Sequence, residues 1–254
     1  MKISLIQFDI AWQNPEENIR RMDALLAKAP ASDIYLLPET CSTGFCMEPE
    51  SCAEEERGVT REWMRKQAAA RDGAICGSVM TRTAAGFVNR LYFARPDGEV
   101  LQYDKRHLFS FSGENLAFTA GHERPIWEFR GVKIMPVVCY DLRFPVWMRN
   151  CDEYDVALVV ACWPASRQLA WETLLRARAM ENQCYVAGVN RVGVDPFGNY
   201  EGGSMVVNPY GLSAVECERG VPDVATVEMD MEKMGAFREK FPSLKDRDNF
   251  TIHY

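Results

Sequence analysis

Short apolar segments that suit buried β-strands alternate with helical patterns through most of the 254-residue chain. Five such segments are rich in apolar or β-branched residues: 34–38 (IYLLP), 74–80 (AICGSVM), 132–140 (VKIMPVVCY), 155–164 (DVALVVACWP) and 184–192 (CYVAGVNRV). Runs of this kind are typical of strands that are covered on both faces. The alternation therefore predicts an α/β fold.

Helical patterns lie between these segments. Asn14 followed by Pro15 indicates a helix cap and first turn, and apolar residues then recur at helical spacing over 19–26. Two further helices are expected over 61–71 (REWMRKQAAAR) and 167–183 (RQLAWETLLRARAMENQ). Strand–helix–strand units of this kind favour parallel strand pairs.

Two segments depart from the alternation and are typical of β-hairpins. Residues 87–105 contain two strand patterns around Arg-Pro-Asp-Gly at 95–98, and residues 204–218 turn at Asn-Pro-Tyr-Gly, 208–211. Hairpins pair their strands antiparallel, so parallel and antiparallel pairs are both expected. The sequence therefore predicts one or two mixed β-sheets with helices outside.

Length and composition favour one large domain over two small ones. The chain is 47% hydrophobic, which is enough to bury a substantial core, and no linker, repeat or low-complexity tract interrupts it. We therefore expect a single domain over 1–254. Its polar tail, residues 237–254, is interpreted as a C-terminal arm that packs on the body or on a second subunit, and a solvated tail fits as well.

The charge of the chain argues for a small-molecule partner. A net charge of −7 does not suit a protein that binds nucleic acid or an anionic membrane, because both need a positive field. The N-terminal stretch lacks the features of a secretion signal, and no run approaches the roughly 18 apolar residues of a membrane span. We therefore expect a cytoplasmic protein.

Most common catalytic motifs are absent. There are three histidines, no paired C-x-x-C and no H-x-x-x-H, so no metal site is expected, and neither glycine-rich nucleotide loops nor a G-x-S-x-G elbow occur. Nine cysteines remain, without a secretion signal, and are expected to be reduced: 41, 46, 52, 76, 139, 151, 162, 184 and 217. Cysteines are often plain core residues, so a functional role for any one needs further support.

Cys139 has the local context of a nucleophile. It ends an apolar strand pattern in 137–145 (VVCYDLRFP), and a turn with an expected helix over 143–151 follows. Backbone N–H groups at the start of such a helix would stabilise a thiolate and could hold an oxyanion. Packing in the core is the alternative for this residue and is also our interpretation of Cys162.

Two other strand ends carry polar side chains. Glu39 follows the apolar run Leu-Leu-Pro at 36–38, and Lys105 lies where the second strand of the first hairpin ends. A buried carboxylate without a partner is costly, and burial moves its pKa toward the range of a useful base. Three strand ends could therefore bring a carboxylate, an ammonium and a thiol to one edge.

These three motifs make the chain similar to the nitrilase, or carbon–nitrogen hydrolase, superfamily. They occur in its order and rough spacing, at 37–40 (LPET), 103–109 (YDKRHLF) and 137–145. The resemblance extends to the first strand, 2–10, and to 161–193, which looks like the branch that contains ω-amidases. It implies a four-layer αββα sandwich with two mixed β-sheets, a homodimer, and an amidase that needs no cofactor.

The resemblance also implies roles for individual residues. Cys139 corresponds to the nucleophile, Glu39 to the general base and Lys105 to the residue that stabilises the tetrahedral intermediate. Glu114 matches a second glutamate near the lysine, and the backbone N–H of Tyr140 is the expected partner of Lys105 in the oxyanion site. The implied reaction forms a thioester and releases ammonia.

The substrate is less closely defined by the sequence. Resemblance to ω-amidases suggests a small dicarboxylate monoamide, such as 2-oxoglutaramate or 2-oxosuccinamate. Arg143 and His107 are candidate partners for its carboxylate, and Phe118 and Trp163 are candidate apolar walls. An ion pair with Asp141 or another carboxylate is the alternative for Arg143, and a hydrogen-bonded core position is the alternative for His107.

Two other functions remain compatible with the sequence. One is a different carbon–nitrogen hydrolase, acting on a nitrile, a carbamoyl group or a modified amino acid. The other is a non-catalytic binding or thiol-redox protein on the same scaffold. The complete set of Glu39, Lys105, Glu114 and Cys139 argues against the second, since a protein without catalysis need not keep all four.

Overall fold

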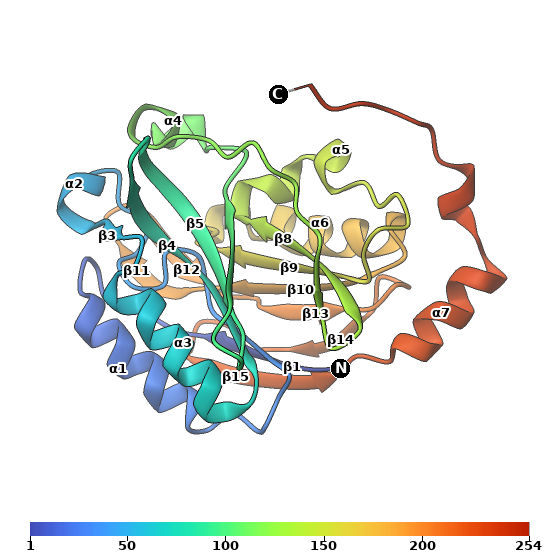
Figure 1. Cartoon of the computed structure of the whole chain (residues 1–254), viewed down its shortest axis with the longest axis horizontal. Coiled ribbons are helices and arrows are strands. Elements are labelled where there is room, and N and C mark those ends of the chain that lie inside the picture. Colours follow the sequence, from blue (N-terminus) through green and yellow to red (C-terminus); the bar gives the residue numbers. More distant parts are fainter. Residues whose placement is uncertain (254) are drawn as a thin grey trace.

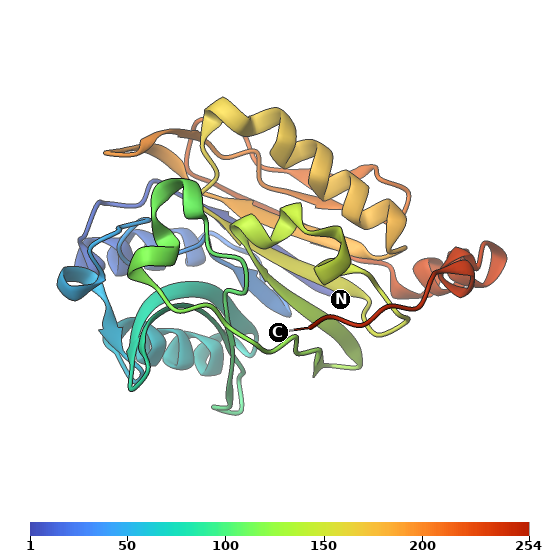
Figure 2. The same ribbon diagram turned by 90° about the horizontal axis from the view of Figure 1, so that it is seen from above.

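Two β-sheets lie face to face, and helices cover their outer sides (Figures 1 and 2). The computed structural model describes residues 1–253. Both sheets contain parallel and antiparallel pairs, such as the parallel β1–β2 and antiparallel β1–β15 pairs of one sheet, and the parallel β8–β9 and antiparallel β7–β8 pairs of the other. The predicted αββα sandwich with two mixed sheets is therefore confirmed.

The first sheet contains the N-terminal strand and the first hairpin. Its spatial order is β15 (Asp223–Glu228), β1 (Lys2–Gln7), β2 (Ile34–Leu36), β4 (Ala74–Thr83), β5 (Gly86–Ala94) and β6 (Val100–Asp104), with β3 (Glu54–Glu55) paired to β4. Alternate residues serve its two faces, as expected for strands. Ile34 and Leu36 pack in the core between the sheets, whereas Tyr35 and Leu37 pack in the cluster beneath the outer helices.

The second sheet contains the strand that leads to Cys139. Its spatial order is β14 (Ser213–Glu216), β13 (Met205–Val207), β10 (Tyr185–Asn190), β9 (Val156–Ala161), β8 (Val132–Val138) and β7 (Trp127–Phe129). A small third sheet pairs β11 (Val192–Asp195) with β12 (Gly198–Glu201). The buried central strands β8, β9 and β10 account for the near-continuous apolar runs in the sequence.

The three long helices expected from the sequence are confirmed. Asn14 caps α1 (Pro15–Leu26) by accepting a hydrogen bond from the N–H of Glu17. With α3 (Val59–Arg71), this helix covers the first sheet, and α6 (Gln168–Glu181) covers the second (Figure 2). The shorter helices are α2 (Pro49–Cys52), α4 (Glu114–Ala117), α5 (Pro145–Met148) and α7 (Met231–Lys240), and the 3₁₀ turns are Ser110–Ser112, Cys139–Arg143, Ala165–Arg167 and Ser243–Asp246.

The helix expected over 143–151 is wrong in extent. The chain instead forms the 3₁₀ turn Cys139–Arg143 and the four-residue helix α5. Phe144 between them is extended, with φ −107° and ψ 93°. Pro145 explains the break, because a proline disfavours helical geometry in the residue before it.

The C-terminal segment begins as a helix and ends as an extended strap. Phe237, the first residue of the predicted arm, lies within α7, and residue 254, the last, lies outside the described residues. Arg238 anchors this segment by donating to Asp155 Oδ1 at 2.9 Å and to the Tyr154 carbonyl at 2.8 Å. The remainder turns back around the outside of the molecule, past α5 (Figure 1).

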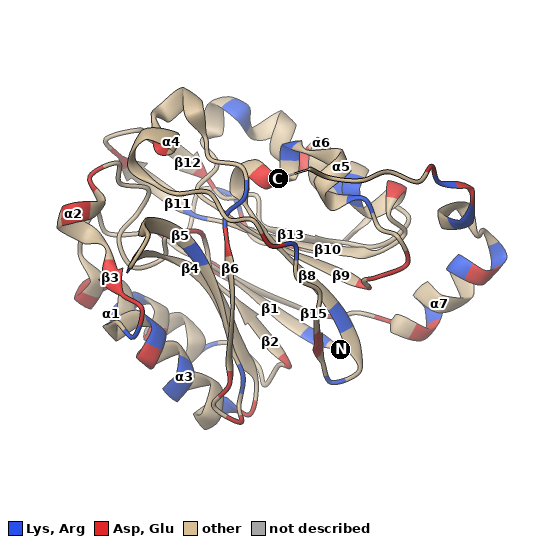
Figure 3. Cartoon of the chain, turned by 45° about the horizontal axis from the view of Figure 1, so that its top comes forward, with Lys and Arg blue, Asp and Glu red and all other residues tan. Residues whose placement is uncertain are grey.

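Charged residues lie mainly on the outer helices and in loops, while most of the sheet residues are uncharged (Figure 3). None of the helices within residues 1–253 is both long enough and apolar enough to cross a membrane. The buried charges that do occur inside the molecule are therefore the exceptions that need an explanation. Three of them, Glu39, Lys105 and Glu114, lie together.

Candidate active site

The three strand ends meet at one site, as the sequence predicts, but they come from both sheets and not from one edge of a single sheet. Glu39 follows β2, Lys105 directly follows β6, and Cys139 directly follows β8. Glu114 comes from the first residue of α4, in the loop after β6. The carboxylate and ammonium thus come from one sheet and the thiol from the other, so the site depends on how the sheets pack against each other.

The ammonium of Lys105 bridges two carboxylates. Its Nζ lies 2.9 Å from Glu39 Oε1, and 3.0 and 2.9 Å from the two Glu114 oxygens. All three side chains are buried, so the contacts are shielded from water. One buried lysine between two acids would be costly without good hydrogen bonding, because each charge loses its hydration.

Further donors complete the coordination of both carboxylates. The backbone N–H of Cys162 donates to Glu39 Oε2 at 2.8 Å, and Asn89 Nδ2 donates to Glu39 Oε1 at 2.8 Å. The backbone N–H of Phe109 donates to Glu114 Oε2 at 2.5 Å. Both oxygens of Glu39 are therefore occupied by fixed donors, which hold the carboxylate in one orientation.

Asn89 and the backbone N–H of Cys162 are partners of Glu39 that the sequence analysis did not find. Asn89 is a buried polar residue inside the apolar strand β5, and this interruption of the apolar pattern was a usable signal. The N–H of Cys162 has no sequence signal, because every residue except proline carries one. Its position after β9 was recognised only as a strand end.

Burial and neighbouring charges shift the pKa values of Lys105 and Glu114. Burial alone would lower the pKa of Lys105, but Glu114 and Glu39 outweigh it and raise that pKa well above its usual range. Burial raises the pKa of Glu114, and Glu39 adds to this effect while Lys105 opposes it. The lysine therefore stays cationic, which suits a group that stabilises developing negative charge.

Cys139 sits in a strained backbone conformation at the end of β8. Its φ is +47°, in the left-handed region that non-glycine residues rarely adopt. Such strain costs of order 1–3 kcal/mol and persists only where the surroundings impose it. Thr40, directly after Glu39, has a φ of +43°. Strain at two of the strand ends is typical of functional sites.

Asp141 holds the turn that carries Cys139. Its buried carboxylate accepts from the N–H of Val138 at 3.1 Å and from the Tyr103 hydroxyl at 2.8 Å. It also accepts from His107, through the backbone N–H at 2.9 Å and Nδ1 at 2.8 Å. Four donors therefore converge on one carboxylate and fix the turn after β8 against the end of β6 and the loop that follows it.

The environment of the Cys139 thiol differs from the expected one. The sequence predicted a helix start whose N–H groups stabilise a thiolate. The chain forms only a short 3₁₀ turn there, and the thiol pKa is set mainly by its other surroundings. Burial and the neighbouring Glu39 raise the pKa of the thiol well above its usual range, and Lys105 only partly opposes them. The resting group is a thiol, so its attack on a carbonyl requires removal of the proton.

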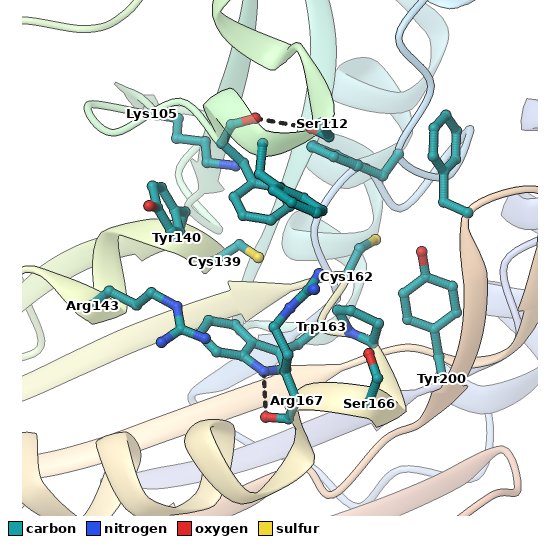
Figure 4. A pocket seen from close by; sticks show the side chains of 15 residues that line it. Lys105, Ser112, Cys139, Tyr140, Arg143, Cys162, Trp163, Ser166, Arg167 and Tyr200 are labelled. Carbon is teal, nitrogen blue, oxygen red and sulfur yellow. Dashed lines mark hydrogen bonds between the residues drawn. The ribbon is translucent and has the colours of Figure 1, made fainter.

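A cavity of about 380 Å³ lies over Cys139 (Figure 4). Lys105, Tyr140, Arg143 and Trp163 line it together with Cys139. The remaining wall residues are mostly aromatic or small: Phe45, Phe109, Phe111, Ser112, Cys162, Pro164, Ser166, Arg167, Phe197 and Tyr200. Such a volume suits a small organic substrate.

The structure does not bring His107 and Phe118 to the cavity wall. The ring of His107 is engaged with Asp141 and stacks on Phe144, with the ring centres 3.7 Å apart, so this residue is hydrogen-bonded structure. Phe118 is buried in a small cluster with Cys46 and Met80. Neither is therefore placed to contact a substrate in this cavity.

Within residues 1–253, no three His, Cys, Asp or Glu side chains are arranged as ligands of a metal ion. The cavity wall instead holds the Cys139 thiol, the Lys105 ammonium and two guanidinium groups, together with serine and tyrosine hydroxyls. Together with the buried carboxylates behind Lys105, they are a thiol, an acid–base group and fixed positive charge. These are the groups that a cysteine-dependent acyl transfer uses.

Comparison with known proteins agrees with that assignment. The Carbon-nitrogen hydrolase family model matches residues 2–239, and the chain belongs to this family. The omega-amidase YafV of Yersinia enterocolitica is 44% identical over 253 residues, covering 99% of this chain and 98% of its own. The 2-oxoglutaramate amidase of Bacillus subtilis is 34% identical over 251 residues, covering 96% of each chain.

A solved structure shares the fold almost throughout. A carbon–nitrogen hydrolase superfamily protein from Xanthomonas campestris, with an arsenic adduct in its active site, superposes with a TM-score of 0.97. It is 44% identical, and the match covers 100% of this chain and 99% of that one. The protein is therefore an enzyme of the carbon–nitrogen hydrolase class, with an amidase function.

Proposed function

We propose that the protein is an ω-amidase, which hydrolyses the terminal amide of a small dicarboxylate monoamide such as 2-oxoglutaramate. The observation that carries the proposal is the buried Glu39–Lys105–Glu114 cluster beside Cys139, at the base of a cavity whose wall also holds guanidinium groups. The omega-amidase and 2-oxoglutaramate amidase relatives support this substrate class.

The first half of the reaction acylates Cys139. Glu39 takes the thiol proton, and Sγ attacks the amide carbonyl. Lys105 Nζ and the backbone N–H of Tyr140 hold the negative charge that develops on the carbonyl oxygen. Tyr140 is the second residue of the 3₁₀ turn, and N–H groups at a helix start have no partner within the helix.

The second half restores the enzyme. The tetrahedral intermediate expels ammonia, protonated by Glu39, and leaves a thioester between the acyl group and Cys139. Glu39 then takes a proton from water as the water attacks the thioester, which releases the carboxylic acid and returns the proton to the thiol. Glu114 keeps Lys105 in place through both of its carboxylate oxygens. The balance is amide plus water to acid plus ammonia, and no cofactor takes part.

The far end of the substrate meets the opposite part of the cavity. Arg143 supplies a positive charge for the distal carboxylate, and its guanidinium stacks over Trp163 with Cζ 4.8 Å from the ring centre. An arginine mounted on an aromatic ring is well suited to bind a carboxylate through two parallel hydrogen bonds.

We expect the enzyme to be a cytoplasmic homodimer. Exposed apolar side chains from α6, the β13–β14 turn and α7 support association: Met180, Tyr210 and Phe241 are 50%, 47% and 59% exposed. Tyr210 and Phe237 connect this patch, with ring centres 4.3 Å apart. Sedimentation of the purified protein tests the dimer, and a monomer at micromolar concentration would exclude it.

Ammonia release from 2-oxoglutaramate and succinamate tests the function. Wild-type protein should turn over both, while Cys139→Ala and Lys105→Ala variants that remain folded should not. Intact-mass measurement of quenched wild-type enzyme should show an acyl adduct on Cys139. Activity on nitriles or ureides without activity on either monoamide would assign a different carbon–nitrogen hydrolase. Reaction of Cys139 with disulfides alone, without an acyl adduct, would assign a thiol-redox protein.

A further inference from the structure

Two arginines in the cavity wall have no acidic partner. Arg143 stacks over Trp163, and Arg167 stacks over Phe109 with its Cζ 5.2 Å from the ring centre. Both line the cavity above Cys139, and neither forms an ion pair with any residue in 1–253. Figure 4 shows the Arg167 guanidinium pointing into the cavity toward Cys139. A partly buried guanidinium without a counter-charge is a binding group for an anion.

The nearest candidate acids are already occupied. Asp141, the alternative partner considered for Arg143, accepts instead from Tyr103 and His107. Glu172, on the helix that follows Arg167, pairs with Arg219 and accepts from Gln168. No carboxylate of these neighbouring elements is left to neutralise either cavity arginine.

Asp195, which contacts the cavity-lining residue Tyr200, is likewise engaged. Its two oxygens accept from Arg191 at 2.7 Å and from the hydroxyl of Tyr200 at 3.2 Å. Glu39 and Glu114 point at Lys105, as described above. The cavity therefore combines three cationic side chains with no acidic side chain in its wall, in a chain whose net charge is −7.

Trp163 links the two arginines into one rigid unit. Its ring stacks against the Arg143 guanidinium, and its indole Nε1 donates to the carbonyl of Arg167 at 2.9 Å. Its own backbone N–H donates to Asn190 Oδ1 at 2.7 Å. On the other side, Arg178 donates twice to the carbonyl of Leu142, directly before Arg143, at 3.0 and 2.8 Å. The backbones that carry both guanidinium groups are thus fixed before any ligand arrives.

We propose that Arg167 is a specificity-determining residue, which together with Arg143 forms a two-arginine clamp for the carboxylate at the far end of the substrate. The inference rests on the proposed ω-amidase function and adds Arg167, which the sequence analysis did not select. Two preorganised guanidinium groups offer more donors than one carboxylate needs, so they also have capacity for a neighbouring keto oxygen of a 2-oxo acid. Neutral amides of the same length gain nothing from this clamp.

The clamp acts away from the reacting atoms and makes the same contacts before and during acyl transfer. Its loss should therefore raise KM with little change in kcat. Removing one charge-assisted contact should raise KM for succinamate about 10- to 100-fold. Butyramide, in which a methyl group replaces the carboxyl group of succinamate, should be turned over by wild-type and variant enzyme with the same kcat/KM.

The decisive experiment measures both substrates with Arg167→Gln, Arg143→Gln and a matched control, Arg176→Gln. Arg176 lies on α6 outside the cavity, where it pairs with Glu216, so its variant should match wild type on both amides. The rate of iodoacetamide modification at Cys139, followed by peptide mass spectrometry, should be the same in all variants. If Arg167→Gln does not fold, Arg167→Lys takes its place, because lysine keeps the charge but lacks the paired N–H donors of the guanidinium.

Binding of succinate to the Cys139→Ala protein, measured by calorimetry, provides a test that needs no turnover. Succinate should bind, and adding Arg167→Gln should weaken it by a similar factor. Unchanged succinamate kinetics and succinate binding in Arg167→Gln would overturn the clamp. Equal losses on succinamate and butyramide would also overturn it, because they would indicate a structural role. A wild-type enzyme that prefers butyramide to succinamate would instead refute the proposed ω-amidase function itself.

Discussion

The backbone N–H of Cys162, at the end of β9, donates to Glu39 Oε2 at 2.8 Å, across the boundary between the two sheets. Glu39 follows a strand of the first sheet and Cys139 a strand of the second, so this bond ties the proposed base to the sheet that carries the proposed nucleophile. The other oxygen of Glu39 accepts from Lys105. An NH₂ group in place of either carboxylate oxygen would therefore face a hydrogen-bond donor.

Glu39→Gln should therefore affect turnover and thiol reactivity in opposite directions. Turnover should fall at least about 100-fold, because a positioned general base typically contributes 10²- to 10⁴-fold. Glu39 also helps to raise the pKa of Cys139, so its loss should lower that pKa. Alkylation of Cys139 by iodoacetamide should consequently become faster near neutral pH.

The measurement is the rate of alkylation at Cys139 between about pH 7 and pH 10, around the ordinary thiol pKa. In wild-type protein the rate should still be rising at the upper end, because the thiolate forms only above the usual range. The variant should show its rise at lower pH. A plateau near neutral pH in the wild type would contradict a raised pKa for this thiol.

Much of the site could be predicted because its side chains mark the ends of apolar strands. Glu39 and Cys139 each follow a buried apolar run, and Lys105 follows the second strand of a hairpin. A buried polar residue at such a place has few purely structural uses. The mixed sheets likewise follow from the strand–helix–strand units and the hairpins, whereas the face-to-face sandwich was implied by the family resemblance. Local pattern is sufficient where one strand determines the position of one side chain.

Other features depend on contacts between distant segments, which local pattern does not encode. The sequence made His107 a plausible cationic partner for the substrate, but in the structure its ring contacts Asp141, 34 residues away. Arg167 resembles an ordinary residue at a helix start, and only the approach of Phe109 places it over the cavity. The helix expected over 143–151 does not form as predicted for a local reason, because Pro145 keeps Phe144 out of helical geometry.

The balance of charge around Lys105 should control stability. Lys105→Met leaves Glu39 and Glu114 buried beside each other without a cation, which should cost about 3–5 kcal/mol of unfolding free energy. Glu114→Gln should cost less, because Lys105 and Glu39 remain as a matched pair. The double variant Lys105→Met/Glu114→Gln should recover part of the loss. Denaturant unfolding measures all three.

The loss in Lys105→Met should also depend on pH. Burial raises the pKa of Glu114, and Lys105 partly opposes this effect. Removing the lysine should therefore raise the pKa of Glu114 further. A carboxyl with a raised pKa binds its proton more tightly in the folded state, and stability falls as the pH rises from the ordinary carboxyl range through that pKa. The deficit relative to wild type should thus be smaller near pH 5 than near pH 8, and a deficit that grows on acidification would contradict this.

Asp141→Asn should loosen the turn that carries the nucleophile. All contacts of Asp141 come from donors, including the hydroxyl of Tyr103 and the backbone N–H of Val138. An asparagine turns an NH₂ group toward at least one of them, which should cost about 1–3 kcal/mol. Thermal unfolding and kcat should both fall, whereas Asp97→Asn in the exposed hairpin turn should change neither. Normal kcat in Asp141→Asn would show that the turn is held by other contacts.

Gly121 should prove essential for placing Lys105. Its N–H donates to the carbonyl of Lys105 at 2.9 Å, and a Cβ on residue 121 would overlap the backbone carbonyl of Asp104. Since backbone cannot move aside as a flexible side chain can, Gly121→Ala should displace the end of β6 and, with it, the ammonium. We expect lower kcat and a loss of about 1–3 kcal/mol in stability, typical of overpacking. Gly235→Ala, in α7 where a Cβ meets open space, is the matched control and should stabilise the protein slightly. Equal stability and activity in the two variants would show that the chain around Lys105 yields more easily than its packing indicates.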